Sequence, residues 1–460
     1  MLLLLFLVAA YIPWQFPVDP LPEPTGRYAV GVTDFELTDH GRPELLCQKK
    51  SCEDRKLRLR MWYPAKNAGN RAKRSYASES EVSGTMAGMA KLMSLPGGIF
   101  SHFSRVTTNS VENAPVIDKQ QLPVVIFSHG LYSYMWQSTA LLESLASEGY
   151  LVFSIHHPYD AAAVEFSSGE LLEAYIPEQN QLQGEIQALR KKAYSEIDIN
   201  KRFDFFMQYI ERAYAASDSK LTRSAPQWVA DQLFVADYLV EGELPARVRA
   251  VASRGRYDKI AFTGMSFGGS TAVAACRLSK RCAVTINLDG ADSHFLGINS
   301  APTVPTLHLA HDVHRLQQQS EPELPVNTEL LYNDFSEQRF AHAGREKNLY
   351  SYIVKGSHHF AFSDASLLLP GLLARILAGE TEAEAMLDLQ LNLVLSFLQA
   401  GLDTDDFSNF LAAANARQGR LSKHNSEFVS DWWNSLSEER KEQIAIRLQR
   451  LKNETWRRDN

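Results

Sequence analysis

A pentapeptide of the form G-x-S-x-G, residues 264–268, constrains the fold of this chain more than any other feature. It follows the short β-prone segment 259–263 and precedes 269–278, a run of small, helix-compatible residues. Strand, sharp turn and helix is the context in which this pattern forms a nucleophile elbow. The glycines permit the tight turn, and Ser266 then projects its hydroxyl above the sheet at a helix N-terminus. The sequence therefore predicts an α/β fold with Ser266 as a nucleophile.

A serine nucleophile needs a base and an acid, which follow it in the chain order Asp or Glu, then His. Residues 352–355 are typical of a strand, and the loop after them carries His358 and His359, either of which could accept the serine proton near neutral pH. Asp289 and Asp312 each follow an apolar strand. Both would lie at carboxyl ends of strands, where open α/β sheets place their chemistry. The residues alone leave both the base and the acid open.

The segment 122–127 is a continuous apolar run, as expected of a buried parallel strand. It ends in Ser128-His129-Gly130-Leu131, and a loop of this kind commonly presents a backbone N–H to a substrate carbonyl. The second donor would be the N–H of Phe267, directly after the nucleophile. Together they predict an oxyanion hole, in which the loss of one donor typically costs roughly 10²–10³ in rate.

These blocks, residues 127–131, 264–269, 288–289 and 356–359, resemble those of the plasma, lipoprotein-associated type of platelet-activating-factor acetylhydrolase, a family with many bacterial esterase-like members. Segments 24–31 and 60–64 are similar to the entry segment and first strand of that family. The resemblance covers about residues 24–400, with gaps at two insertions. Met265 is a departure, because the family often has a histidine before the nucleophile.

The resemblance implies an α/β-hydrolase fold, with a mostly parallel central sheet flanked by helices. It implies Asp289 rather than Asp312 as the acid, His359 as the base, and the N–H groups of Leu131 and Phe267 as oxyanion donors. The implied substrates are phospholipids with short or oxidised sn-2 acyl chains, cleaved without calcium or another cofactor. Four further side chains are candidates for the substrate pocket: His129, Met265, His157 and His358.

Other functions remain open at this stage. A general carboxylesterase or polyester hydrolase would use the same triad on other esters. A non-catalytic binding module is a third possibility, which the intact Ser, Asp and His oppose. The net charge of −7 gives no reason to expect nucleic acid as a partner. His308, His311 and His314 lie close together in the sequence, but a strand-and-loop context favours polar strand-end histidines over a metal site.

The domain organisation predicted is one catalytic domain over 24–402, preceded by an apolar signal or anchor and a proline-rich linker over 1–23. Two insertions are expected. The first, 67–120, has a helical apolar stripe that fits a lid or lipid-facing surface, or a helix packed on the core. In the second, 168–245, residues 181–214 are expected to form a helical cap above the site, and residues 228–238 to continue a helix that leads to the elbow strand. Residues 403–460 are expected to form a charged helical extension that packs back on the domain or contacts another copy or a membrane.

Four cysteines fall into two close pairs, Cys47 with Cys52 and Cys276 with Cys282. Local pairs would be disulfides in an oxidising compartment, and free thiols otherwise. With the apolar N-terminus they favour a periplasmic or secreted protein that could be tethered to a membrane.

Overall fold

The computed structural model describes residues 16–456, except for 48–51, 68, 70, 178–180, 216–219, 292–302, 321, 324–325, 332–333, 336–347 and 425–426. The predicted signal or anchor over residues 1–15 therefore lies outside the described residues, and its fate stays a prediction.

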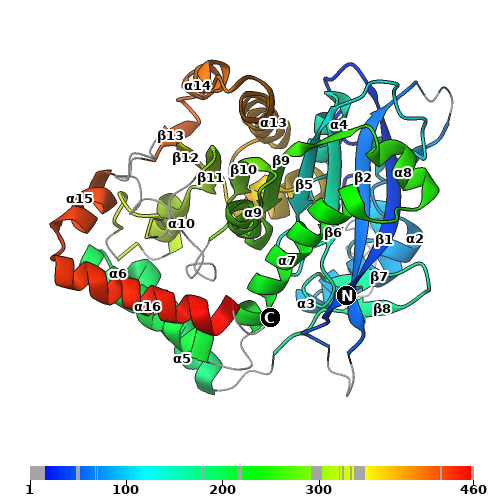
Figure 1. Ribbon diagram of the computed structural model, residues 1–460. Helices are drawn as coiled ribbons and strands as arrows, with labels where there is room; N and C mark the ends of the chain where they lie inside the picture. The colour runs from blue at the N-terminus through cyan, green and yellow to red at the C-terminus, as the bar shows by residue number, and fades with distance from the viewer. Residues whose placement is uncertain are drawn as a thin grey trace, which may run out of the picture.

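An eleven-stranded sheet runs through the protein in the order β13-β12-β11-β10-β9-β5-β6-β2-β1-β4-β3 (Figure 1). Its strands are β1 (Ala29–Pro43), β2 (Asp54–Ala65), β3 (Lys73–Ser75), β4 (Thr107–Glu112), β5 (Leu122–Ser128), β6 (Leu151–His156), β9 (Gly255–Met265), β10 (Cys282–Leu288), β11 (Thr306–His311), β12 (Leu349–Val354) and β13 (Leu421–Lys423). β7 (Ala163–Glu165) and β8 (Leu171–Glu173) form a separate two-stranded sheet. The strands from β12 to β6 are mutually parallel, and the edges are mixed. This is the predicted α/β-hydrolase fold.

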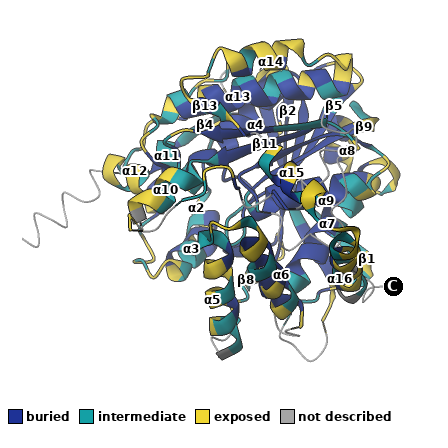
Figure 2. Ribbon diagram, turned by 90° about the vertical axis from the view of Figure 1, so that its left-hand side faces the viewer, coloured by how far each residue is buried: buried dark blue, intermediate teal, exposed yellow. Residues whose placement is uncertain are grey.

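The central strands carry apolar residues on both faces because helices cover both. In β5, Val125 and Phe127 belong to one core cluster, whereas Val124 and Ile126 belong to the other. The first cluster also contains side chains of α4 (Thr139–Ser147) and α13 (Ala383–Gln399). The second contains side chains of α7 (Lys220–Glu241), α8 (Ala246–Ala252) and α9 (Phe267–Leu278). Figure 2 shows the resulting arrangement, with buried strands at the centre and exposed residues on the outer faces of the helices.

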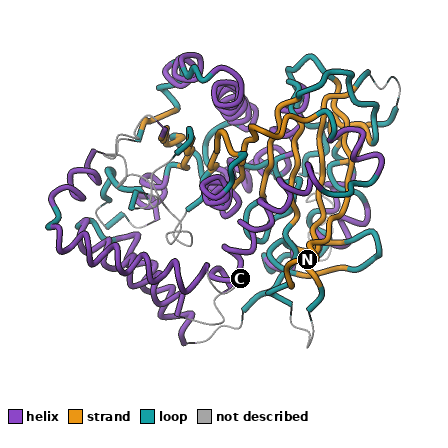
Figure 3. Tube along the Cα trace, in the orientation of Figure 1, coloured by secondary structure: helices purple, strands orange, loops and turns teal. Residues whose placement is uncertain are grey.

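A group of helices lies apart from the sheet, to the left in Figures 1 and 3. It contains α5 (Gln181–Ser195), α6 (Ile199–Ala215), α15 (Glu427–Ser435) and α16 (Glu438–Trp456). We call these four helices the cap. Phe203 and Phe206 of α6 pack with Trp432 of α15 and Ile444 of α16 in one buried apolar cluster. The second insertion and the C-terminal segment therefore build the cap together, which hydrophobic burial explains and sequence order does not.

Within the second insertion, α7 packs on α9 and the sheet, in keeping with the helix expected before the elbow strand. Two details differ from the predicted organisation. The C-terminal segment is not wholly helical, because β13 extends the sheet beside β12. The first insertion is not a lid: β3 and β4 extend the opposite edge of the sheet, and Met86, Ala90 and Phe103 are buried in the main core. Its apolar stripe therefore packs on the core, one of the two alternatives considered.

Three further helices have eight residues each: α10 (Val313–Ser320), α12 (Gly371–Ala378) and α14 (Ser408–Asn415). The remaining short elements are α2 (Glu79–Glu81), α3 (Ala87–Leu92) and α11 (Ala365–Leu368). By length and composition, Ala383–Thr404 is the one described helix that could cross a membrane, but 56% of its most apolar window is buried inside the protein. Burial of this kind is typical of a core helix.

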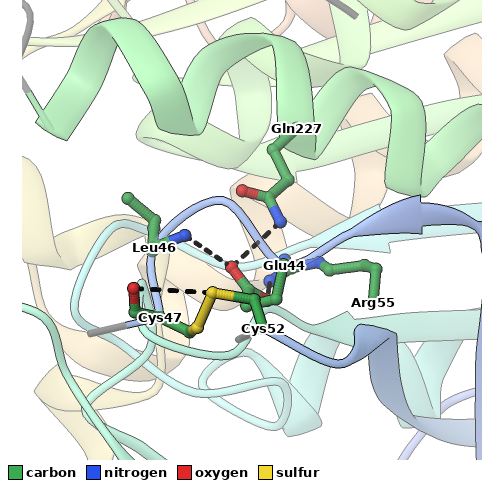
Figure 4. Close-up of a disulfide and its surroundings, with 6 residues drawn as sticks. All are labelled: Glu44, Leu46, Cys47, Cys52, Arg55 and Gln227. Carbon is green, nitrogen blue, oxygen red and sulfur yellow. Dashed lines mark hydrogen bonds and ion pairs between the residues drawn. A yellow bond between two sulfur atoms is a disulfide. The ribbon is translucent and has the colours of Figure 1, made fainter. Parts of the chain in front are cut away.

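Both close cysteine pairs form disulfides, Cys47 with Cys52 and Cys276 with Cys282. The first closes the chain between β1 and β2 (Figure 4). Beside it, Glu44 accepts hydrogen bonds from the Leu46 N–H and from Gln227, and it forms an ion pair with Arg55. The second disulfide links the end of α9 to the start of β10, so it braces the helix that follows Ser266.

Candidate active site

Ser266 occupies the sharp turn between β9 and α9, with φ 57° and ψ −128°. A residue other than glycine adopts this conformation only at a cost, and such strain concentrates at functional sites. The Ser266 N–H donates to the Leu288 carbonyl of the neighbouring β10 at 2.8 Å, and the Gly269 N–H donates to the Ser266 carbonyl at 2.9 Å within the turn. A Cβ atom on Gly268 would lie 2.1 Å from the backbone oxygen of Ser128, so only glycine fits there. The pentapeptide thus forms the predicted elbow.

The sheet brings three side chains from separate strand ends to one place. The His359 Nε2 lies 2.9 Å from the Ser266 Oγ, and the His359 Nδ1 lies 2.5 Å from the Asp289 Oδ2. Because a carboxylate only accepts, Nδ1 carries the proton that is donated to Asp289. Nε2 is then free to accept the proton of Ser266. The arrangement is that of a Ser-His-Asp triad.

Asp289 is almost fully buried, and a second histidine also contacts it. The backbone N–H of His311 donates to Oδ1 at 2.8 Å, and the His311 Nδ1 lies 2.7 Å from Oδ2. Burial raises the pKa of the Asp289 carboxyl, but the neighbouring charges of His311 and His359 and their hydrogen bonds lower it by more. The net pKa lies below its ordinary value, so Asp289 is ionised at neutral pH.

His311 is a contact that the sequence reasoning missed. The sequence grouped His311 with His308 and His314 as strand-end histidines. In the structure His311 contacts Asp289 of the triad, whereas His314 bonds the Leu330 carbonyl at 2.8 Å. Burial lowers the pKa of His311, and the charge and hydrogen bond of Asp289 raise it by more, so the net pKa is raised. The available signal was position: His311 ends β11, the strand directly beside β10.

The site also has the spacing of a cation-binding group. One ligand atom each from Asp289, His311 and His359 lies within 4.8 Å of the others. The same atoms are, however, engaged in the hydrogen bonds just described. These contacts account for the geometry without a metal ion, and no step of the chemistry below uses one.

The alternative acid and base lie elsewhere. Asp312 accepts a hydrogen bond from the Gly356 N–H at 2.9 Å, which supports the turn after β12. The His358 Nδ1 lies 3.0 Å from the Ile376 carbonyl of α12. The structure therefore brings Asp289 and His359, rather than Asp312 and His358, to Ser266. His358 is also absent from the described lining of the cavity beside Ser266, contrary to its prediction as a pocket residue.

The predicted oxyanion loop lies against the elbow. Ser128 at the end of β5 pairs in register with Gly264, and a Cβ atom on Gly130 would lie 3.3 Å from the Ser266 Cβ. The side chains of Leu131 and Phe267 share one apolar cluster with Trp228. Within the part of the chain that the structure describes, the Leu131 N–H donates to no other group. This placement suits Leu131 and Phe267 to the role of paired donors.

The predictions of Met265, His129 and His157 as pocket residues are wrong, because all three are buried and none belongs to the described lining of the cavity. The Met265 side chain points into the main core. His157 stacks on Trp228 with ring centroids 3.7 Å apart, and its backbone N–H donates to the His129 Nε2 at 3.2 Å. Burial lowers the pKa of both histidines, so they are neutral at physiological pH. His157 therefore supports the oxyanion loop through its contacts with Ser128 and His129, which belong to that loop.

This support continues into a buried polar network. The His157 Nδ1 lies 2.8 Å from Asp231, and the Ser128 hydroxyl lies 3.0 Å from the His157 Nε2. Asp231 also pairs with Arg55, and both side chains are fully buried. The pKa of Asp231 is held low: burial raises it, and Arg55 and Arg42 lower it by more. The network therefore connects α7 and β2 to the strand end that carries the oxyanion loop.

A cavity of about 690 Å³ opens beside Ser266, between the sheet and the cap. Its volume is in the range of pockets that enclose small ligands. From the site it is lined by Ser266, Asp289, His311 and His359, and from the cap by side chains of α5 and α6. The cap thus lies over the site, as the sequence predicted for part of the second insertion. The complete described lining is Arg190, Lys191, Tyr194, Ser195, Arg202, Ser266, Asp289, Ala291, His311, Val313, His314, Leu316, Gln317, Leu330, Leu331 and His359.

Comparison with known proteins agrees with this geometry. A family described as platelet-activating factor acetylhydrolase, isoform II, matches residues 15–421. Platelet-activating factor acetylhydrolase from Canis lupus familiaris is 24% identical over 388 residues, which cover 83% of this chain and 77% of the relative. The enzyme of the same name from Gallus gallus is 23% identical over 395 residues, 83% of each chain.

A solved structure shares the fold. Ferulic acid esterase from Streptomyces cinnamoneus superposes with a TM-score of 0.60 at 20% identity, covering 89% of this chain and all of that one. The match over most of the sequence, together with the elbow and its partners, identifies the chain as a member of the platelet-activating factor acetylhydrolase isoform II family of ester hydrolases.

Proposed function

We propose that this protein is a serine ester hydrolase that works through an acyl-enzyme. The observation that carries the proposal is the hydrogen-bonded chain from Ser266 through His359 to a buried, ionised Asp289. In this proposal Ser266 is the nucleophile, His359 the base and then the acid, and Asp289 the group that orients the imidazole.

The reaction follows from these positions. The Ser266 Oγ attacks the ester carbonyl carbon while its proton passes to the His359 Nε2. The carbonyl oxygen becomes an oxyanion, which the N–H groups of Leu131 and Phe267 stabilise. Collapse expels the alcohol, which takes the proton from His359 and leaves an acyl-serine. Water then attacks the acyl group by the same route in reverse, releasing the acid and restoring Ser266.

We propose phospholipids with short or oxidised sn-2 acyl chains as the substrates. Family membership supports this choice, since the named relatives are platelet-activating factor acetylhydrolases. The cavity is compatible with it, because its lining combines apolar side chains from α10 and the following segment with cationic side chains of the cap. An amphipathic ester would satisfy both sides.

A general carboxylesterase or polyester hydrolase is the second candidate. The observation in its favour is the fold match to a ferulic acid esterase, which extends over the whole of that chain. A non-catalytic binding module has less support, because it would not account for the strained Ser266 or its hydrogen bond to His359.

The test is initial hydrolysis rates on p-nitrophenyl esters of increasing chain length and on a short-chain sn-2 phosphatidylcholine. Ser266→Ala is the control, and labelling of Ser266 by a fluorophosphonate probe reports the nucleophile directly. Phospholipid hydrolysis that disappears in the variant supports the first proposal. Hydrolysis of simple esters alone supports the second candidate, and the absence of both turnover and labelling in folded protein refutes the enzyme.

We also propose that the protein is exported, to the periplasm or outside the cell, and that its N-terminus can tether it to a membrane. Two disulfides support export, because such bonds persist in oxidising compartments. Fractionation of the producing cell, with mass spectrometry of the unreduced protein, tests both points. Cytosolic protein with four free thiols would contradict the proposal.

A further inference from the structure

Arg202 of α6 lines the active-site cavity although it is only 7% exposed. Among the described residues, the guanidinium makes one hydrogen bond, from Nη1 to the Glu196 carbonyl oxygen at 3.3 Å, close to the limit for such a bond. That contact uses one of the five N–H donors of a guanidinium. The side chain therefore brings a cation and several donors to the cavity that Ser266 also lines.

The charge of Arg202 has no ion-pair partner within the described residues. Burial lowers the Arg202 pKa, and the carboxylate of Asp334 acts on it only from a distance. Asp334 is itself committed, because its two oxygens accept from the His424 Nε2 at 2.8 Å and the Leu331 N–H at 2.5 Å. A guanidinium nevertheless stays protonated in proteins, so the cavity contains a buried positive charge.

Two other deeply buried arginines have carboxylate partners. Arg55 pairs with Glu44 and Asp231, and Arg60 pairs with Asp34 and Glu81. Pairing of this kind is the rule for buried charges, because an unpaired charge in a low-dielectric interior is costly. Arg202 departs from the rule in a cavity where a bound molecule could supply the missing anion.

The other residues that line the cavity also suit an amphipathic anion. Arg190 and Lys191 of α5 line the same side, and Asp289, whose oxygens already accept from two histidines, is the one carboxylate in the described lining. The lining also contains apolar side chains of Val313, Leu316, Leu330 and Leu331. The cavity therefore favours a ligand with an apolar chain and a negative charge.

We propose that Arg202 is the centre of an anion subsite in the cap, which binds a phosphate or carboxylate group of the ester whose carbonyl reaches Ser266. The inference rests on the proposed ester hydrolase and adds its substrate class: amphipathic esters that carry an anionic phosphate or carboxylate group. The anionic group lies under the cap, and the apolar chain lies along α10.

The kinetic test uses Arg202→Gln, which removes the charge but keeps a donor for the Glu196 carbonyl. The value of kcat/KM is measured on an anionic ester, mono-p-nitrophenyl glutarate, and on its neutral counterpart, p-nitrophenyl butyrate. We expect a loss of at least about ten-fold on the anionic ester and a change below about two-fold on the neutral one. Arg202→Lys should recover part of the loss. Equal losses on the two esters would overturn the proposal.

Arg212→Gln is the matched control, since Arg212 lies on the same helix, outside the described lining of the cavity, and pairs with Glu185. It should change neither rate.

A binding test separates this proposal from the proposed function. The thermal midpoint is followed with dodecyl phosphate, dodecanoate, inorganic phosphate and 1-dodecanol, for the wild type and for Arg202→Gln. We expect dodecyl phosphate, dodecanoate or both to raise the thermal midpoint of the wild type but not that of Arg202→Gln. The anion with the larger effect shows whether the subsite prefers a phosphate or a carboxylate group. If the esters are not hydrolysed but the anion raises the midpoint of the wild type alone, the proposed ester hydrolase is refuted and the anion subsite is supported. If the anions act equally on both proteins, or on neither, the subsite is refuted.

Discussion

Replacing Asp289 with asparagine should disable the triad while leaving its outline intact. In the wild type, Oδ1 accepts from the His311 N–H at 2.8 Å, and Oδ2 accepts from the His359 Nδ1 at 2.5 Å. An amide has one acceptor oxygen, and the backbone N–H of His311 cannot be reversed. The amide oxygen should therefore stay with His311, which turns the NH₂ group toward the Nδ1 of His359.

The consequence is a change of tautomer. The His359 Nδ1 would have to accept from the amide, so the imidazole proton moves to Nε2, where it faces the Ser266 Oγ 2.9 Å away. In that form His359 cannot take the serine proton. The equivalent change in a serine protease triad lowers kcat by about 10⁴, and we expect a similar loss here. At 1.36 kcal/mol for each factor of ten, this corresponds to about 5.4 kcal/mol in the barrier.

The assay is kcat on p-nitrophenyl butyrate, with circular dichroism and urea unfolding to show that the variant is folded. Asp312→Asn is the matched control, because Asp312 also follows a strand but bonds the Gly356 N–H rather than His359. We expect the control to stay within about two-fold of the wild type, as for other changes away from the reacting groups. A variant at Asp289 that keeps activity within ten-fold, or an inactive Asp312→Asn, would refute the assignment of the acid.

Three further predictions concern the surroundings of the triad. The pKa of His311 is raised above its ordinary 6.5, so the ion pair with Asp289 stabilises the fold fully below pH 6.5, and this stabilisation is lost as pH rises through the folded pKa. The unfolding free energy should therefore fall over this pH range in the wild type but not in His311→Gln. Equal slopes of unfolding free energy against pH in the two proteins would contradict the pairing. Asp231→Ala leaves the buried Arg55 without one of its two partners and should lower the free energy of unfolding in urea by about 3–5 kcal/mol. Asp237 lies on the same helix and forms an exposed pair with Arg281, so Asp237→Ala should lower it by at most about 1 kcal/mol. Gly268→Ala would force the Ser128 and His129 carbonyls away and should lower kcat by about 10² through the oxyanion loop, whereas Gly184→Ala, where the added methyl meets nothing within 4 Å, should leave kcat unchanged.

The cap connects these predictions to substrate choice. Its helices come from two distant parts of the chain, and they bring Arg190, Lys191 and Arg202 over a catalytic group that belongs to the sheet. Chemistry and specificity are therefore carried by separate layers. Substitutions in the cap should alter which esters react more than how the ester bond is broken.

The sequence by itself determined the catalytic half of this protein. Its signals are local: continuous apolar runs for the buried parallel strands, and the glycines at 264 and 268 that a turn packed against backbone atoms requires. Strand-end position narrowed the acid to Asp289 or Asp312, and the base to His358 or His359. Resemblance to a family chose between them, because both members of each pair follow a strand equally well.

Only the tertiary structure decided what surrounds the site. Whether His129 and His157 face substrate or support a loop depends on Trp228 and Asp231, which lie about 70 residues or more further along the chain. His311 meets Asp289 because β10 and β11 are neighbours in the sheet. The cap joins α6 to α15 and α16 because each has an apolar face that can be buried only against the others. Packing between distant segments depends on shape and burial, and neither has a local signature in the sequence.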